Sequence, residues 1–316
     1  MEEAAADETQ QVRPDEDDSG YGGRSELSTT SLASSVFHYD EENGRSYHGF
    51  HRGKYVLPND EAEQERMDLH HRSVRLVLDN KHWISPMQPT RVLDVGTGTG
   101  LWAIDVADQI PSAHVVGVDL SPIQPTLIPP NLQFEIMDAD DTWEGFGQHF
   151  DLIHTQFMNG VSIRSWDFFY EQAFISLMSQ GRVENQEADM CFHCDDVNPP
   201  ADSAYMRWIE LWNEGLENLG LTGRCCPGRM EEKMKSRGFV NVSAHFYRLP
   251  VGPWPVEDWQ KEAGALNLKA LLDGISGLSL KVFLHGLKWE REEMEILLMQ
   301  VRQELKSCRL HLYIPL

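Results

Sequence analysis

The spacing of apolar residues predicts an amphipathic helix near the start of the ordered part of the chain. An apolar residue recurs every three to four positions from Asn59 to about Asn80, which is the period of a helix with one buried face. Asp60, with Glu63 three residues further on, resembles a capping box at the start of this helix. The apolar stripe consists of Met67, Leu69, Val74, Leu76 and Leu78, together with His71.

Between residues 91 and 188, short apolar runs alternate with helical stretches. The runs are rich in Val, Ile, Leu and Phe, which is typical of buried strands. Strands that alternate with helices form a parallel sheet with helices on both faces, so the fold class is α/β. The predicted strands are 91–95, 114–118, 132–137, 150–155 and 182–187, and the predicted helices are 101–109 and 166–178.

After residue 188 the pattern changes from mixed to helical. The predicted helices are 204–219, 230–237 and, within a wholly helical block from 257 to 307, 291–306; the predicted strands are 240–248 and 310–314. No stretch approaches the roughly 20 apolar residues that a membrane span requires. The sequence therefore predicts no membrane association.

Residues 1–35 have the composition of a disordered acidic tail. The first twenty residues carry eight acidic side chains and one basic one, which is 7 (8 − 1) of the 23 excess negative charges. The stretch from Ser19 to Ser35 is rich in Gly, Ser and Thr, and too few large apolar residues are present to offset the entropy cost of ordering. The tail serves either docking and regulation or only solubility, and its composition favours solubility. The folded domain is predicted to be 36–316.

Composition excludes several classes of protein. The net charge of −23 and a pI near 4.8 repel phosphate backbones, and no basic patch offsets them, so we expect no direct binding to nucleic acid. The N-terminus lacks the basic and apolar regions of a secretion signal, which favours a cytoplasmic protein. Cys191 and Cys194 have the spacing of half a zinc site, but the adjacent Cys225 and Cys226 cannot easily supply the other two ligands. No metal is therefore expected.

A glycine-rich turn follows the first predicted strand of the sheet. The turn reads Gly96-Thr97-Gly98-Thr-Gly100 and leads into the helix 101–109. Glycines allow positive φ and let a ligand approach the backbone closely. The spacing is G-x-G-x-G, and Leu101 stands where the dinucleotide fingerprint G-x-G-x-x-G has its third glycine. With Asp94 two residues before the first glycine, the turn suits S-adenosylmethionine (SAM), which carries no pyrophosphate.

The next two strands end in acidic residues that complete a nucleoside site. Asp119 ends the second strand, where a carboxylate can accept hydrogen bonds from both ribose hydroxyls. Asp138 and Ala139 follow the third strand and suit the amino group and the ring face of adenine. The predicted cofactor-binding residues are Asp94, Gly96, Thr97, Gly98, Gly100, Asp119, Leu120, Asp138 and Ala139.

At these motifs the sequence resembles the fungal LaeA-like methyltransferases, a class I SAM-dependent family found with secondary-metabolite gene clusters. The resemblance spans roughly residues 36–314, and the run Asp119–Pro125 is its most specific part. The matching segments are Tyr47–Asp60 (YHGFHRGKYVLPND), Leu93–Ala103 (LDVGTGTGLWA), Asp119–Pro125 (DLSPIQP), Phe150–His154 (FDLIH), Val183–Glu187 (VENQE), His193–Asp196 (HCDD) and Pro200–Ala204 (PADSA).

The resemblance implies the Rossmann-like class I methyltransferase fold. Its sheet has seven mostly parallel strands, the last two of which form a reversed hairpin, and the helical block 257–307 would be inserted within that hairpin. Residues 36–90 would then be an N-terminal cap and 91–188 the SAM-binding core. One departure lies at Met178-Ser-Gln-Gly181, where the family usually has Lys-Pro-Gly-Gly. We expect this segment to be a surface turn that leaves SAM binding intact.

Methyl transfer requires mainly that the acceptor and the methyl group be held together in a dry site, and a base is needed only for a poorly ionised acceptor. His154, at the end of the fourth strand, is the best-placed candidate base, although a buried histidine bonded to backbone is an equally good interpretation. Glu187 and His193 are weaker candidates. We expect the block 257–307, together with Tyr47–Asp60, to cover the acceptor pocket.

Two functions fit the sequence, and they belong to different classes. The first is an enzyme that methylates a small molecule in a fungal secondary-metabolite pathway. The second, implied by the resemblance, is a SAM-binding nuclear regulator of metabolite gene clusters with velvet-family partners. The chain shows no strong basic import signal, which favours the enzyme. A nicotinamide dehydrogenase is a third interpretation, and Leu101 argues against it.

Overall fold

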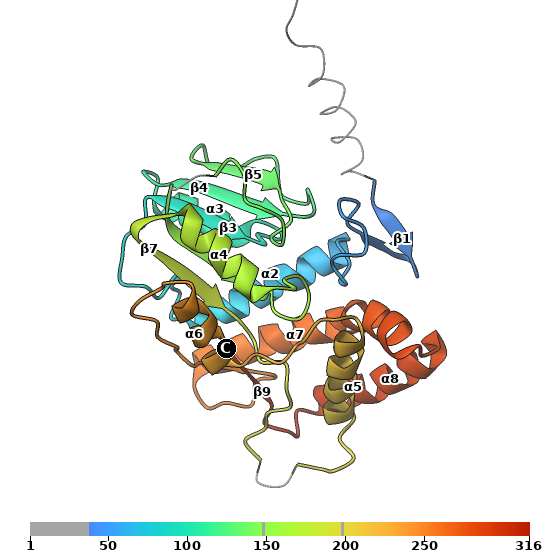
Figure 1. The fold of residues 1–316 in the computed structure, drawn as a ribbon. Helices are drawn as coiled ribbons and strands as arrows, with labels where there is room; N and C mark the ends of the chain where they lie inside the picture. Colours follow the sequence, from blue (N-terminus) through green and yellow to red (C-terminus); the bar gives the residue numbers. More distant parts are fainter. Residues whose placement is uncertain (1–37, 147–148, 197–198) are drawn as a thin grey trace, which may run out of the picture.

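A five-stranded parallel sheet forms one side of the molecule in a computed structural model, which describes residues 38–146, 149–196 and 199–316 (Figure 1). The strand order is β5-β4-β3-β6-β7. The strands are β3 (Arg91–Val95), β4 (His114–Asp119), β5 (Leu132–Ile136), β6 (Phe150–Gln156) and β7 (Leu177–Gln186). Because β3 pairs with both β4 and β6, the chain changes direction across the sheet at β3. In such sheets ligands bind at the carboxyl ends of the strands beside this point.

Alternate residues of the strands enter two separate cores, one on each face of the sheet. Leu93 and Ile153 pack with aromatic residues of α4 (Trp166–Ser176) on one face. Val92 and Leu152 pack with Trp102 and other residues of α3 (Leu101–Gln109) on the opposite face. Since all of these strand residues are fully buried, the sheet is covered on both sides, as the alternating pattern predicts.

Most of the remaining helices form a second mass beside the sheet (Figure 1). Their shared core contains about half of the buried apolar side chains, with Trp208, Phe283 and Leu298 fully buried. A small hairpin of β1 (Asp40–Glu42) and β2 (Arg45–Tyr47), which the sequence analysis does not predict, precedes them. The helices of this mass are α2 (Glu61–Val77), α5 (Ala204–Asn218), α7 (Asp258–Lys281) with its π-helical continuation η1 (Val282–Leu287), and α8 (Arg291–Ser307). α6 (Pro227–Ser236) packs on α4 instead, and its Met230 and Met234 join the core on that face of the sheet.

Half of the predicted capping box forms at the start of α2. Asp60 is the N-cap, and its carboxylate accepts the N–H of Glu63 at 3.1 Å. The carboxylate of Glu63 accepts instead from Arg66 Nε at 2.8 Å and is fully buried.

The prediction of seven strands in one sheet is wrong in the described chain. β8 (Arg248–Pro250) and β9 (Tyr313–Pro315) pair with each other in a separate two-stranded antiparallel sheet. The predicted strand 240–248 is wrong for residues 240–247, since β8 begins only at Arg248. Residues 240–247 and β7 line opposite parts of a cavity of about 800 Å³, and Val240 and Phe246 are largely exposed. The helical block 257–307 does lie between β8 and β9, as the family resemblance implies.

The predicted surface turn at Met178–Gly181 is also wrong. β7 begins at Leu177, five residues before the predicted start, and contains this segment. The register between β6 and β7 shifts here, because Phe150 pairs with Leu177 while Leu152 pairs with Arg182. Gln180 has a φ of 68°, so the polar, glycine-containing sequence forms a bulge within the strand.

One helix is long and apolar enough to span a membrane, contrary to the sequence prediction. It comprises α7 and η1, Asp258–Leu287, and a little over half of its most apolar window is buried within the fold. α7 packs closely on α2, since a Cβ atom at Gly274 would lie 2.0 Å from Arg66 Cδ. Its apolar residues are therefore used in the shared core of the helices.

Candidate active site

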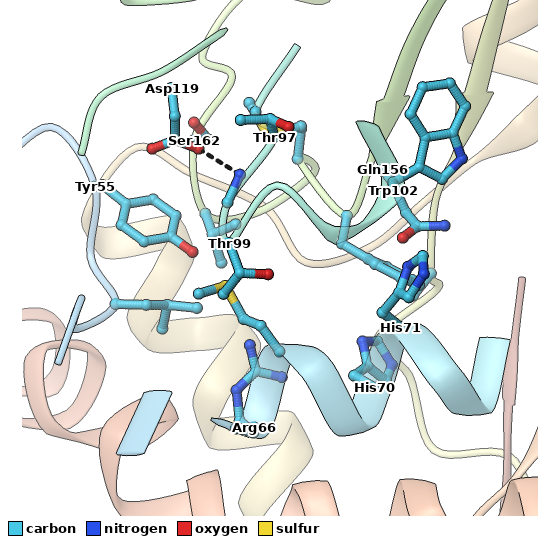
Figure 2. A pocket seen from close by; sticks show the side chains of 18 of the residues that line it. Tyr55, Arg66, His70, His71, Thr97, Thr99, Trp102, Asp119, Gln156 and Ser162 are labelled. Carbon is cyan, nitrogen blue, oxygen red and sulfur yellow. Dashed lines mark hydrogen bonds between the residues drawn. The ribbon is translucent and has the colours of Figure 1, made fainter. Parts of the chain in front are cut away.

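A cavity of about 230 Å³ lies at the carboxyl ends of β3, β4 and β6 (Figure 2). The cofactor loop after β3 forms one side, and α2 with the segment Tyr55–Asn59 forms another. Four residues of α7 also line the cavity: Asn267, Ala270, Leu271 and Leu278. Seven of the predicted cofactor residues line the cavity: Asp94, Gly96, Thr97, Gly98, Asp119, Leu120 and Ala139.

The glycines of the cofactor loop have the backbone angles that their sequence pattern predicts. Gly96, Gly98 and Gly100 have φ values of 74°, 57° and 83°. A Cβ atom at Gly96 would lie 2.1 Å from Met158 Sδ, whereas one at Gly98 would meet only Met67 Sδ at 3.5 Å. Gly98 therefore faces the open part of the site. Gly100 does not line the cavity and is instead the N-cap of α3.

Asp119 connects β4 to the cofactor loop. Its carboxylate accepts the N–H of Gly98 and the N–H of Ser121, both at 2.9 Å, and the first of these bonds is the dashed line in Figure 2. Burial raises the pKa of Asp119 to about 6 despite these bonds. The carboxylate retains lone pairs that can accept hydrogen bonds from a ligand.

Asp94 orients two neighbours rather than facing the cavity freely. Its Oδ2 accepts from Thr97 Oγ1 at 2.7 Å, and its Oδ1 lies 2.8 Å from His154 Nδ1. The imidazole of His154 is fully buried and stacks flat on Trp102, with 3.6 Å between ring centroids. Its Nε2 has no hydrogen-bond partner in the described chain. His154 thus contributes to the cavity wall, and its role as a base stays a prediction.

The carboxylate of Asp138 is not brought to the cavity in the way the sequence predicts. It lies 2.8 Å from His51 Nδ1 and 3.1 Å from Lys54 Nζ, and Lys54 also contacts Asp140 at 3.0 Å. Burial raises the pKa of Asp138, but these hydrogen bonds outweigh it and hold that pKa below its usual value. Asp138 therefore fastens the segment before α2 to the end of β5, a contact between distant parts of the chain that local sequence does not reveal.

A group of potential metal ligands occurs at the same place. Among the residues that the structure describes, only His51, Asp138 and Asp141 bring three such side chains together. The ammonium group of Lys54 already contacts Asp138, so a cation there would be repelled. The five cysteines have free thiols.

Sequence reasoning missed the contribution of α2, whereas it did expect the segment Tyr47–Asp60 before this helix to cover the pocket. Figure 2 shows Tyr55, Arg66 and His70 directed toward the cavity from this side. Burial lowers the pKa of His70 to about 3, so its imidazole is neutral. The segment Tyr47–Asp60 carries part of the family resemblance, but nothing in its pattern indicates which side chains point inward.

Glu187, a weaker candidate in the sequence, lies in the cavity wall just after β7. Its Oε1 accepts the N–H of Met158 at 3.2 Å, and its Oε2 accepts the N–H of Asn159 at 3.0 Å. Burial raises the pKa of Glu187 to about 8. The carboxylate of Glu184, three residues earlier, accepts the N–H groups of Ile84 and Ser85 and lies outside this cavity. His193 does not line this cavity.

The residues present fit SAM. Gly98 leaves space beside the loop, and the Asp119 carboxylate at the end of β4 is an acceptor for ribose hydroxyls. Apolar Leu120 and Ala139 line the same cavity and suit a purine ring. A Rossmann-like sheet with this loop and without the third glycine of the dinucleotide fingerprint defines a SAM-dependent methyltransferase.

Comparison with known proteins also identifies the chain as a methyltransferase. Residues 67–243 match a family model described as a methyltransferase domain. The chain is 35% identical to the methyltransferase pytC of Aspergillus terreus, over 90% of this chain and 88% of that protein. It is 34% identical to the secondary metabolism regulator LAE1 of Cochliobolus heterostrophus, over 86% of this chain and 91% of that protein. It is 33% identical to the protein-methionine methyltransferase laeA of Emericella nidulans, over 87% and 74% respectively. The chain belongs to the LaeA-like methyltransferase family, and SAM is its cofactor.

Proposed function

We propose that this protein methylates a small molecule in a fungal secondary-metabolite pathway. The observation that carries the proposal is that a single cavity joins the cofactor loop to an apolar wall from distant parts of the chain. Trp212, Leu271 and Leu278 belong to that wall. Pockets of this kind, mostly apolar with a few placed polar groups, bind small molecules. The relative from Aspergillus terreus is named as a methyltransferase.

The block 257–307 and the segment Tyr47–Asp60 are the proposed cover of the acceptor. Both contribute lining residues, Leu271 from the first and Tyr55 from the second. Substrate choice in this fold class comes from the segments that cover the carboxyl edge of the sheet. The block is therefore expected to determine which acceptor is methylated.

The test is mass spectrometry of metabolites from strains with and without the gene. Loss of one methyl group from one compound, with accumulation of its demethylated precursor, is the expected result. A fluorescent fusion of the active protein should be found in the cytoplasm. An unchanged set of methylated compounds would refute the assignment as a pathway enzyme.

The second candidate is a SAM-binding regulator in the nucleus with velvet-family partners. The relatives named as secondary metabolism regulators favour it. It predicts loss of whole families of compounds, nuclear fluorescence and recovery of a velvet-family protein with the tagged chain. These three results together would replace the pathway enzyme with the regulator.

A further inference from the structure

Glu187 places a carboxylate in the cavity wall, and Met158 lies between this carboxylate and the cofactor loop. Met158 donates its N–H to Glu187, and the Met158 side chain fills the space beside Gly96, where a Cβ atom would lie 2.1 Å from its sulfur. Within the described residues no ion pair includes Glu187, so its charge has no cation to balance it.

Asn159 presents an unused donor at the same wall. Its side chain is 8% exposed, and its Oδ1 accepts from Trp166 Nε1 at 3.2 Å, which orients the amide. Its Nδ2 is buried and has no hydrogen-bond partner among the described residues. A buried donor without a partner costs roughly 1–3 kcal/mol, which a ligand oxygen would recover. Glu187 and Asn159 therefore place an acceptor and a free donor in the same part of the cavity wall.

We propose that the methyl acceptor is a hydroxyl compound, that Asn159 Nδ2 donates a hydrogen bond to the hydroxyl oxygen, and that Glu187 takes the hydroxyl proton. The inference builds on the proposed function, since it specifies the chemistry of the small-molecule acceptor. A hydroxyl has one proton and two lone pairs, so it can donate to Glu187, accept from Asn159 and still attack with the second lone pair. A neutral amine has a single lone pair, which Asn159 would occupy.

Methyl transfer to the hydroxyl can be written with every bond and proton accounted for. When SAM is bound, the chemistry it supplies is an activated methyl group: the O–C bond forms as the C–S bond breaks, and the bonding pair stays on sulfur. Glu187 accepts the proton of the acceptor and becomes neutral, and it then releases that proton to solvent. A base with a pKa close to the working pH is the most effective, and the burial that raises the pKa of Glu187 to about 8 meets this condition.

The described residues give Glu187 no ion pair, and the Arg66 guanidinium in the same cavity is already paired with Glu63 at 2.8 Å. Tyr170 on α4 and Cys225 before α6 interact with its charge, and burial raises the pKa of both groups. Asp189 accepts the N–H of Cys225 and adds another negative charge. His70 of α2, which stacks on Phe157, is held neutral by burial.

Glu187 is better placed for this task than His154. The His154 ring is pinned between Asp94 and the face of Trp102 and is fully buried. It cannot approach an acceptor without displacing the indole. Glu187 is partly exposed, and its residue lines the cavity directly.

Infrared spectroscopy tests the proposal with phenol as the probe. In the protein with S-adenosylhomocysteine bound, we expect a carboxylic acid C=O band that titrates near pH 8 and is absent from Glu187→Gln. Phenol should shift this band, whereas anisole, which has no hydroxyl proton, should leave it in place. Asn159→Leu should keep the band and lose the response to phenol. A band that phenol does not move, or that anisole moves equally, overturns the proposal.

Kinetics with the acceptor found in the metabolite experiment gives the second test. Glu187→Gln should lower kcat about 10²- to 10⁴-fold, remove the acidic limb of the pH profile and leave SAM affinity unchanged. Glu184→Gln is the matched control, because it also weakens the acceptance of two backbone N–H groups but lies outside the cavity. Three results would each overturn the assignment. The first is an equal loss of activity in Glu187→Gln and Glu184→Gln, and the second is loss of the acidic limb in His154→Gln alone. The third is an acceptor that is methylated at a group other than a hydroxyl. A strain comparison that shows no missing methyl group refutes the pathway role, and the infrared response to phenol is judged independently of it.

Discussion

Lowering the pH from 7 to 5 should weaken SAM binding because it protonates Asp119. Burial raises the pKa of Asp119 to about 6, whereas the usual aspartate pKa is near 3.9. Only the ionised carboxylate keeps all its oxygen lone pairs available for two backbone N–H groups and for ribose hydroxyls. Cofactor binding should therefore favour the ionised form and lower this pKa in the complex.

The size of the effect follows from the pKa. A group with a pKa of 6 is about nine-tenths ionised at pH 7 and about one-tenth ionised at pH 5, so the dissociation constant of SAM should rise about tenfold, or about 1.4 kcal/mol. The pH dependence of folding stability that Asp119 contributes has the opposite sign to that of most carboxylates, whose pKa is lowered in the folded protein. Because the pKa is raised in the folded state, Asp119 favours the folded protein below pH 4, and this contribution is lost as the pH rises from about 4 to about 6.

Calorimetric titration of SAM at pH 5, 6, 7 and 8 measures the effect. Asp119→Ala should bind SAM roughly 10- to 100-fold more weakly at pH 7, because a hydrogen bond to a charged group contributes roughly 1.5–3 kcal/mol, and its affinity should no longer change between pH 5 and 7. Asp108→Ala, an exposed carboxylate on α3, is the control and should behave as the unmodified protein. An unchanged affinity in folded Asp119→Ala, or the same pH dependence in that variant, would refute the role of Asp119.

Three further predictions concern other parts of the chain. Gly98→Val should abolish SAM binding in calorimetry, because a φ of 57° strains a branched residue and its side chain would enter the cofactor space; tight binding by that variant would contradict the placement of the loop. Deleting residues 1–35 should leave the Tm and the SAM affinity nearly unchanged, and a markedly lower Tm in a thermal melt would show that the predicted tail packs on the domain. Exchange of the block 257–307 with that of a relative acting on another metabolite should transfer acceptor choice while SAM affinity stays constant, and acceptor choice that remains with residues 36–250 would exclude the block as the cover.

The sequence predicts well those parts of the fold that depend on neighbouring residues. The bounds of β3 and α3 match the prediction residue for residue, because an apolar run, a glycine turn and a helical period follow one another without interruption. The positive φ values of Gly96, Gly98 and Gly100 also follow from local sequence. The same holds for α8, where five apolar residues at helical spacing are all buried.

The failures occur where distant segments decide the outcome. The alternation of apolar residues in 240–248 is adequate for a strand, but whether a strand forms depends on a partner, and here a cavity lies between the segment and β7. Asp138 follows a strand as an adenine-binding acid would, yet His51 and Lys54, more than 80 residues earlier, hold its carboxylate.

In the site, too, local sequence predicts some residues, whereas others depend on contacts between distant segments. The loop and Asp119 are found from spacing, since the carboxyl ends of parallel strands meet at one edge. The position of Glu187 beside Met158 and Asn159 depends on how the chain after β6 folds back toward the end of β7. Its raised pKa follows from burial, which the residue type alone cannot indicate.

The cavity wall includes residues from Tyr55 to Ile314, and this range has a consequence for the order of events during protein synthesis. The loop Gly96–Gly100 has been synthesised when about a third of the 316 residues are joined, whereas Leu278 and Ile314 are added far later. A nascent chain therefore has the strands, the glycines and Asp119 in place while one side of its site is still missing. We therefore expect cofactor binding to stabilise the chain fully only after α7 and β9 have joined the site, and a chain truncated before α7 to bind SAM more weakly.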